Sequence, residues 1–166
     1  MLLFLLPLSN RADLNTYKGV IPEVTVVSPL YTKEFSKALI KDLEGYSELA
    51  YSDGDGYSVC YGTRSYLGER VNKEVCEERL DILLDKVWDK LLSKYDLTTS
   101  QVAILSVFYW NVNIGEDLDK AIKKKDFCNI ENMMLQYINY KGKPNSVLLE
   151  RRCWELFYLK KAYKNR

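Results

Sequence analysis

The stretch EGYSELAYSDGDGYSVCYG, residues 44–62, decides the fold of this 166-residue chain. Between Tyr51 and Gly62, two short runs of aromatic and β-branched residues flank a turn rich in Asp and Gly. Asp and Gly tolerate the backbone conformations that tight turns between antiparallel strands require. The stretch therefore predicts a small β-hairpin, to which residues 66–68 add a third short strand or a loop.

Helical periodicity appears on both sides of this hairpin. Before it, Phe35, Leu39 and Leu43 recur at helical spacing between residues 32 and 45, with Thr32 or Ser36 as the cap. After it, Asn72 is expected to cap a long helix. The apolar face of that helix is predicted to carry Cys76, Leu80, Leu83, Val87 and Leu91.

The remainder of the chain also favours helices. Thr98 and Gln101 have the spacing of a capping box and begin a strongly apolar helix, which we expect at the centre of the domain. Shorter helices are predicted over 116–125 and 127–140. A last helix is predicted over 147–163, after a break at Gly142 and Pro144.

These patterns predict an α+β, mainly helical fold with two lobes. A β lobe covers about 46–70 and a larger helical lobe about 72–164, within a domain of residues 32–166. A cleft between two such lobes is a natural place for a substrate.

Residues 1–31 are expected to form a separate N-terminal extension or arm, because prolines interrupt any helix there. Residues 23–27 alternate like a short strand. The apolar run at the start is too short to span a bilayer and lacks the basic region of a signal peptide. We therefore favour a packed or docking arm that contacts a membrane or a virion, and a signal-anchor remnant stays open as an alternative.

The absence of histidine narrows the chemistry. It excludes Ser-His-Asp and Cys-His machinery and the His-bearing zinc sites of most peptidases. Acid–base chemistry must therefore use carboxylates, tyrosines, lysines or water. The net charge of +1 points to no partner by itself. The basic segment 141–166 fits either an anionic surface or a solvated helix face.

The cysteines form no Cys-x-x-Cys pair, so neither a zinc motif nor a redox motif is predicted. Because Cys is often buried, we expect mostly buried, free thiols. The even count leaves a disulfide open if the protein reaches an oxidising compartment. The four positions are Cys60, Cys76, Cys128 and Cys153.

Glu44 and Asp53 are the candidate catalytic carboxylates. Glu44 is expected at the end of the first helix and Asp53 at the hairpin turn, so both can face one cleft. Cleavage of a glycosidic bond needs a protonated carboxylic acid and an ionised partner. Glu44 follows an apolar helix face, which favours the neutral acid, whereas the polar turn favours an ionised Asp53. Asp53 also fits as a plain turn former.

Three separated motifs resemble the phage lysozyme or endolysin family, glycoside hydrolase family 24. They are Glu44-Gly45 with Tyr51-x-Asp53 and the run to Gly62, the apolar helix from Gln101 to Asn111, and Arg151-Arg152-x-x-Glu155. The resemblance covers roughly residues 33–160. It implies hydrolysis of the bond between N-acetylmuramic acid and N-acetylglucosamine, with no cofactor and no metal. The implied partner is the peptidoglycan glycan strand and not nucleic acid, and the protein is expected to be a monomer.

By resemblance, Glu44 matches the general acid, Asp53 the carboxylate that holds the attacking water, and Ser58 a Thr whose hydroxyl holds the same water. The turn is one residue shorter than in the family, so Asp55 competes for the role of Asp53. Thr63 replaces a His of many members, so one supporting contact must differ.

Four further residues are expected around these three. One of Arg151 and Arg152 is predicted to turn inward and pair with Glu44 or a neighbouring acid. Tyr57 and Tyr61 are expected to line the cleft and bind substrate.

Two other functions remain open. A lytic transglycosylase would need only Glu44. A non-catalytic wall-binding or virion structural protein would fit the shortened turn and the N-terminal arm. For an enzyme, synthesis in the host cytoplasm and action on the cell wall in the periplasm are expected. Holin release and virion delivery both fit.

Overall fold

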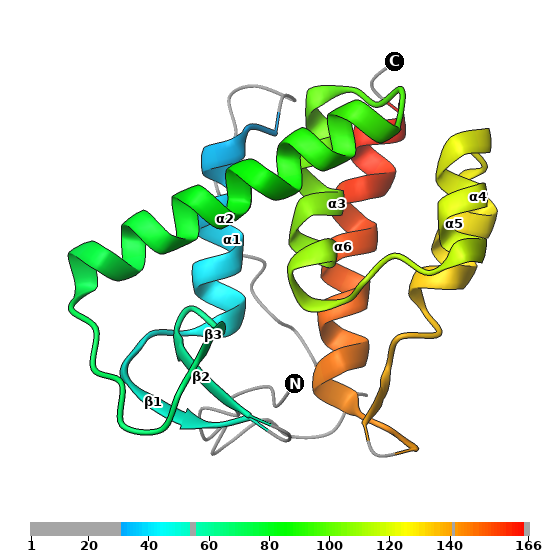
Figure 1. Ribbon diagram of the computed structural model, residues 1–166. Helices are drawn as coiled ribbons and strands as arrows, with labels where there is room; N and C mark the ends of the chain where they lie inside the picture. The colour runs from blue at the N-terminus through cyan, green and yellow to red at the C-terminus, as the bar shows by residue number, and fades with distance from the viewer. Residues whose placement is uncertain (1–30, 54–55, 141, 165–166) are drawn as a thin grey trace.

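The structure, a computed structural model, describes residues 31–53, 56–140 and 142–164. Within these residues it contains six helices, a three-stranded sheet and a two-stranded hairpin (Figure 1). The predicted fold class, mainly helical with a small antiparallel β region, is confirmed. The elements in chain order are α1 Lys33–Glu44, β1 Ser47–Ser52, β2 Tyr57–Cys60, β3 Thr63–Ser65, α2 Lys73–Lys94, α3 Thr99–Asn111, α4 Glu116–Lys124, α5 Phe127–Met134, β4 Asn139–Tyr140, β5 Lys143–Pro144 and α6 Ser146–Lys164.

Local capping signals define the starts of the first three helices as predicted. The Thr32 side chain accepts a hydrogen bond from the backbone N–H of Phe35, and Asn72 caps α2 in the same way. Thr98 and Gln101 form the expected capping box at the start of α3. These contacts satisfy backbone N–H groups that have no partner within the helix. Such caps depend on residues three positions apart and are therefore readable from the sequence.

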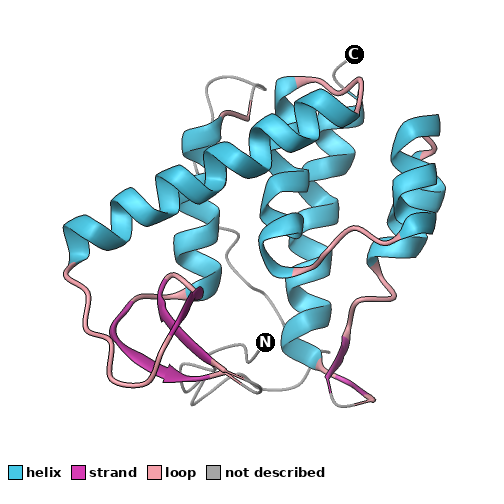
Figure 2. Cartoon of the chain, viewed as in Figure 1, coloured by secondary structure: helices cyan, strands magenta, loops and turns pink. Residues whose placement is uncertain are grey.

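The apolar helix α3 lies at the centre of the helical part, as predicted. It packs against α1, α2 and α6, and its residues from Ser100 to Phe108 are all buried. Figure 2 shows the three-stranded sheet at one end of the molecule, beside the C-terminal end of α1, with the β4–β5 hairpin apart from it beside the start of α6. The end of α1 is thereby placed next to the sheet, which is what positions Glu44.

The buried face of α2 differs from the prediction. Leu84 and Trp88 are buried together with Cys76, Leu80 and Leu91, whereas Leu83 is exposed and Val87 only partly buried. The observed spacing is mostly four residues, and steps of four and three keep side chains on one face of a helix with 3.6 residues per turn.

Of the two alternatives for residues 66–68, the loop is confirmed, and the third strand, Thr63–Ser65, lies directly before it. One predicted boundary was wrong. The helix predicted over 127–140 ends at Met134, where tight turns follow and lead into the hairpin β4–β5. Short strands that pair only with their neighbour leave little periodicity to read.

The three-stranded sheet has the order β1-β2-β3, with both pairs antiparallel. The backbone N–H of Asp53 donates to the carbonyl of Gly56 at 2.9 Å and closes the turn between β1 and β2. The strand expected over 23–27, the rest of the arm up to residue 30, and Asp55 lie outside the described residues. Within the described part, no helix combines the length and the apolar character needed to cross a bilayer.

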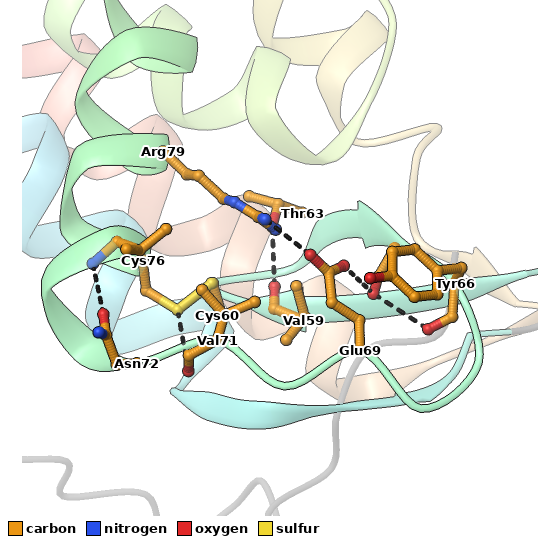
Figure 3. A network of polar contacts seen from close by, with 11 residues as sticks. Val59, Cys60, Thr63, Tyr66, Glu69, Val71, Asn72, Cys76 and Arg79 are labelled. Carbon is orange, nitrogen blue, oxygen red and sulfur yellow. Dashed lines mark hydrogen bonds and ion pairs between the residues drawn. A yellow bond between two sulfur atoms is a disulfide. The ribbon is translucent and has the colours of Figure 1, made fainter.

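The expectation of free, buried thiols was wrong. Cys60 and Cys76 form a disulfide between the end of β2 and the start of α2, with Cα atoms 5.1 Å apart (Figure 3). This separation suits a disulfide. Cys128 and Cys153 are free but exposed. Sequence spacing gave no indication of this pairing, because it depends on how the sheet docks on α2.

Candidate active site

Glu44 is the last residue of α1, and its side chain is only 12 % exposed. The turn between β2 and β3 lies against its carboxylate. Gly62 in that turn has φ +78°, and a Cβ atom there would lie 3.2 Å from Oε2 of Glu44. Glycine is required here both by the left-handed backbone and by the close approach. In the sequence Gly62 is visible only as part of a motif, since its close approach to Glu44 depends on the tertiary structure.

Arg151 makes the inward contact predicted for one of the two arginines. Its Nη1 donates to Oε1 of Glu44 at 2.6 Å, and its Nε donates to Oε1 of Glu155 at 3.2 Å. Burial lowers the pKa of Arg151, but the charges of Glu44 and Glu155 outweigh it and raise the pKa. The guanidinium therefore keeps its charge beside Glu44.

Arg152 does not reach Glu44 and instead supports the network from behind. Its Nε lies 3.0 Å from Oε2 of Glu155, and its Nη2 donates to Oδ1 of Asn111 at 3.1 Å. Its guanidinium also lies 4.7 Å from the ring centre of Phe108, a cation–π contact.

Glu155 is fully buried between the two arginines and was not predicted as a site residue. Burial raises its pKa, and the charges of Arg152 and Arg151 oppose that rise. With Glu44, the cluster contains two carboxyl groups and two guanidinium groups. The signal in the sequence was that Glu155 follows Arg152 by three residues and Arg151 by four. This spacing places all three side chains near one another on one helix.

Asp53 directly follows β1, and Ser58 lies beside it in β2. Both are buried, and the Ser58 hydroxyl donates to Oδ2 of Asp53 at 2.6 Å. Ser58 is opposite Tyr51 in the pairing of β1 with β2. The short turn therefore still brings the hydroxyl to the carboxylate.

Tyr51 is a further site residue that the sequence analysis did not assign. Burial raises the pKa of Tyr51 to about 12, with added contributions from the negative charges of Asp53 and Glu44, while a hydrogen bond with Ser58 opposes the rise. Tyr51 therefore lies within hydrogen-bonding reach of Ser58 and close enough to Asp53 and Glu44 for their charges to affect it.

The two tyrosines expected to bind substrate have different positions. Tyr57 begins β2 and is partly exposed. Tyr61 is buried, its hydroxyl donates to Oε1 of Glu77 at 2.6 Å, and its carbonyl accepts from Nε1 of Trp110 at 3.1 Å. Tyr61 therefore does not present its ring to solvent.

Thr63 is also buried. Its hydroxyl donates to the carbonyl of Val59 at 3.0 Å (Figure 3). The threonine hydroxyl therefore satisfies its hydrogen bond within the sheet and supports the same turn locally.

This arrangement suits acid–base chemistry. One carboxyl group is held by a buried arginine, and a second carboxylate is joined to a hydroxyl on the neighbouring sheet. Of residues 31–53, 56–140 and 142–164, no three Cys, Asp or Glu side chains gather as they would to hold a metal ion.

Comparisons with known proteins agree with this geometry. The family model "Phage lysozyme" matches residues 41–155. None of the curated proteins matches the chain significantly in sequence.

Several solved structures share the fold. The muramidase domain of SpmX from Asticcacaulis excentricus superposes with a TM-score of 0.64 at 22% identity, covering 75% of this chain and 93% of that one. An endolysin from the Escherichia coli phage FAHEc1 gives 0.62 at 20% identity, with 75% and 89% covered. A lysozyme mutant of phage P22 gives 0.60 at 21% identity, with 75% and 94% covered. The family match spans the end of α1, the sheet and α6 up to Glu155, and the chain belongs to the phage lysozyme family.

Proposed function

We propose that this protein is a muramidase that hydrolyses the bond between N-acetylmuramic acid and N-acetylglucosamine in peptidoglycan, with Glu44 as the general acid. The observation that carries the proposal is the Glu44 carboxyl group, held by buried Arg151 and packed against Gly62. Membership in the phage lysozyme family supports the same substrate.

In this proposal, Glu44 donates its proton to the oxygen of the leaving sugar as the glycosidic bond breaks. Negative charge develops on Glu44 as the proton leaves. Arg151, already 2.6 Å away, stabilises that charge without having to move. A preoriented charge of this kind in a site shielded from water is an effective source of catalysis.

Asp53 and Ser58 are proposed to hold the attacking water. The carboxylate accepts one proton of that water, and the Ser58 oxygen offers a lone pair to the other. The 2.6 Å bond from Ser58 to Asp53 and the bond with Tyr51 fix the hydroxyl in one orientation. Held in this way, the water can attack the anomeric carbon while positive charge builds up on the sugar.

The runner-up, a lytic transglycosylase, needs the acid but no water. The bond between Ser58 and Asp53 favours the hydrolase, since a transglycosylase has no use for a held water. A non-catalytic wall-binding or virion structural protein would not require Arg151 and Glu44 to be paired beside Asp53 and Ser58.

The test is digestion of purified peptidoglycan, followed by mass analysis of the released muropeptides. We expect reducing muramic ends from the wild type and none above background from Glu44→Gln. Glu34→Gln, an exposed acid on the same helix, is the matched control and should keep full activity. Asp53→Asn and Ser58→Ala should each lower the rate by about 10²-fold, on the scale of one lost catalytic group.

Different products would separate the three functions. Anhydro-muramic ends, with Asp53→Asn still active, would establish a transglycosylase. An inactive wild type that still binds cell walls would establish a binding protein.

The proposed place of action is the bacterial cell wall. Peptidoglycan lies outside the inner membrane, and release through a holin and delivery by a virion both fit this place of action. Mass analysis of purified virions separates these routes, because only virion delivery places the protein in the particle. The predicted N-terminal arm is proposed to contact a membrane or the virion, except for Tyr31, which is buried against Phe35 and Tyr158. The protein is proposed to act as a monomer.

A further inference from the structure

The turn that contains Gly62 is held by two adjacent residues at the start of α2. Cys76 forms the disulfide with Cys60, and Glu77 accepts the hydrogen bond of Tyr61 at 2.6 Å (Figure 3 shows the disulfide). Two consecutive residues of the turn are thus attached to two consecutive residues of the helix. One attachment is covalent and the other is a charge-assisted hydrogen bond, which is stronger than a neutral one.

Glu77 also joins this turn to the helix that ends in Glu44. It forms ion pairs with Lys41 in the last turn of α1 and with Lys37, the latter at 3.3 Å. Although burial alone would raise it, the contacts from Lys41, Tyr61 and Lys37 lower the pKa of Glu77 to about 2. The carboxylate is therefore ionised wherever the enzyme is expected to work.

A displacement of Tyr61 would move Gly62 and, through it, Glu44, the proposed catalytic acid. Gly62 follows Tyr61 directly, and its backbone lies against the Glu44 carboxylate. On the other side, the Tyr61 carbonyl is fixed by Trp110. Productive geometry must be held to well below 1 Å, so a small shift in this turn is expected to reach the reaction.

We propose that Glu77 is a positioning residue for the proposed muramidase reaction. It holds the Tyr61–Gly62 turn and the last turn of α1 in the relative position that orients Glu44. Glu77 touches no substrate in this proposal. It acts through the Tyr61 hydroxyl and the Lys41 ammonium group. The inference rests on the proposed function, and it gives Tyr61 a positioning role in place of a substrate contact.

The chain offers a matched control for this role. Asp81 lies one helical turn after Glu77 on α2 and pairs with Lys37 at 2.6 Å. Within the described residues, Asp81 makes no contact with Tyr61. Asp81→Asn therefore weakens the pairing of α1 with α2 while leaving the turn untouched.

The experiment compares Glu77→Gln, Tyr61→Phe, the double variant and Asp81→Asn on soluble, uncrosslinked glycan strands. Initial rates of reducing-end release give kcat and KM, and near-ultraviolet circular dichroism gives the folded fraction. We expect Glu77→Gln and Tyr61→Phe each to lower kcat about tenfold with KM within about twofold, because a misplacement of about 1 Å can cost up to 10²-fold. The double variant should lose little more than either single one, since both remove the same contact.

Amide hydrogen exchange in residues 60–63 should be faster in Glu77→Gln and in Tyr61→Phe than in the wild type, with Asp81→Asn unchanged in both exchange and kcat. Equal kcat in all variants, or an equal loss in Asp81→Asn, would overturn the inference. A loss explained by the unfolded fraction would do the same. If the wild type turns over and Glu44→Gln does not, these outcomes leave the proposed function standing. A wild type without turnover would overturn the proposed function, and the role of Glu77 with it.

Discussion

Removing the Cys60–Cys76 disulfide should cost this protein a large part of its stability. The two residues are 16 positions apart, and closing a loop of this length in the unfolded chain is worth about 3 kcal/mol in the chain-entropy model. For a chain of this size, that loss lowers Tm by about 6–12 °C. Both cysteines are buried, so alanine is the better replacement because it buries no new hydroxyl group.

The assay is urea unfolding of the oxidised wild type, the reduced wild type and the Cys60→Ala, Cys76→Ala double variant. The reduced wild type and the double variant should both unfold at lower urea, with the double variant lower by the further cost of two small cavities. The m value should rise in both, because an unfolded chain without the cross-link exposes more surface. Cys128→Ala and Cys153→Ala, at exposed free thiols, should leave the midpoint unchanged.

Two results would refute this reasoning. One is a double variant whose free energy of unfolding lies within about 0.5 kcal/mol of the oxidised wild type. The other is the titration of four reactive thiols in the denatured, unreduced wild type, since the structure predicts two.

Three further predictions concern Glu44 and the contacts around it. Gly62→Ala should cost about 1–3 kcal/mol through its left-handed φ and lower kcat at least tenfold by displacing the Glu44 carboxylate, as urea unfolding and reducing-end assays would measure. Glu155→Gln should cost about 3–5 kcal/mol in thermal unfolding because it leaves two buried arginines without their shared partner, whereas the exposed Glu78→Gln should be neutral. Because the pKa of Glu77 is lowered to about 2 from 4.5, its stabilising contribution is complete above pH 4.5 and is lost as the pH falls toward 2, so the urea midpoint of Glu77→Gln should vary less over this window than that of the wild type.

Much of the fold could be predicted because its signals are local. The Thr32 and Thr98 caps act over three residues, and the Asp-Gly turn between Tyr51 and Gly56 marks the hairpin. The boundary that was missed, after Met134, lies where strands of two residues carry little periodicity. The face of α2 was misjudged because apolar residues occur on both sides of it, and only packing against α3 decides which side is buried.

The sequence by itself determined the chemistry available to this protein. A chain without histidine must use carboxylates, tyrosines, lysines or water for acid–base chemistry, and Glu44 at the end of a helix and Asp53 at a hairpin turn are its candidate pair. Only the tertiary structure decided which arginine pairs with Glu44, which cysteines bond and where the Tyr61 hydroxyl points. Arg151 is 107 positions from Glu44 and Trp110 is 49 from Tyr61, so no local rule relates them. Those contacts arise when buried helices and the sheet pack together, because each buried polar group must then find its partner on a distant element.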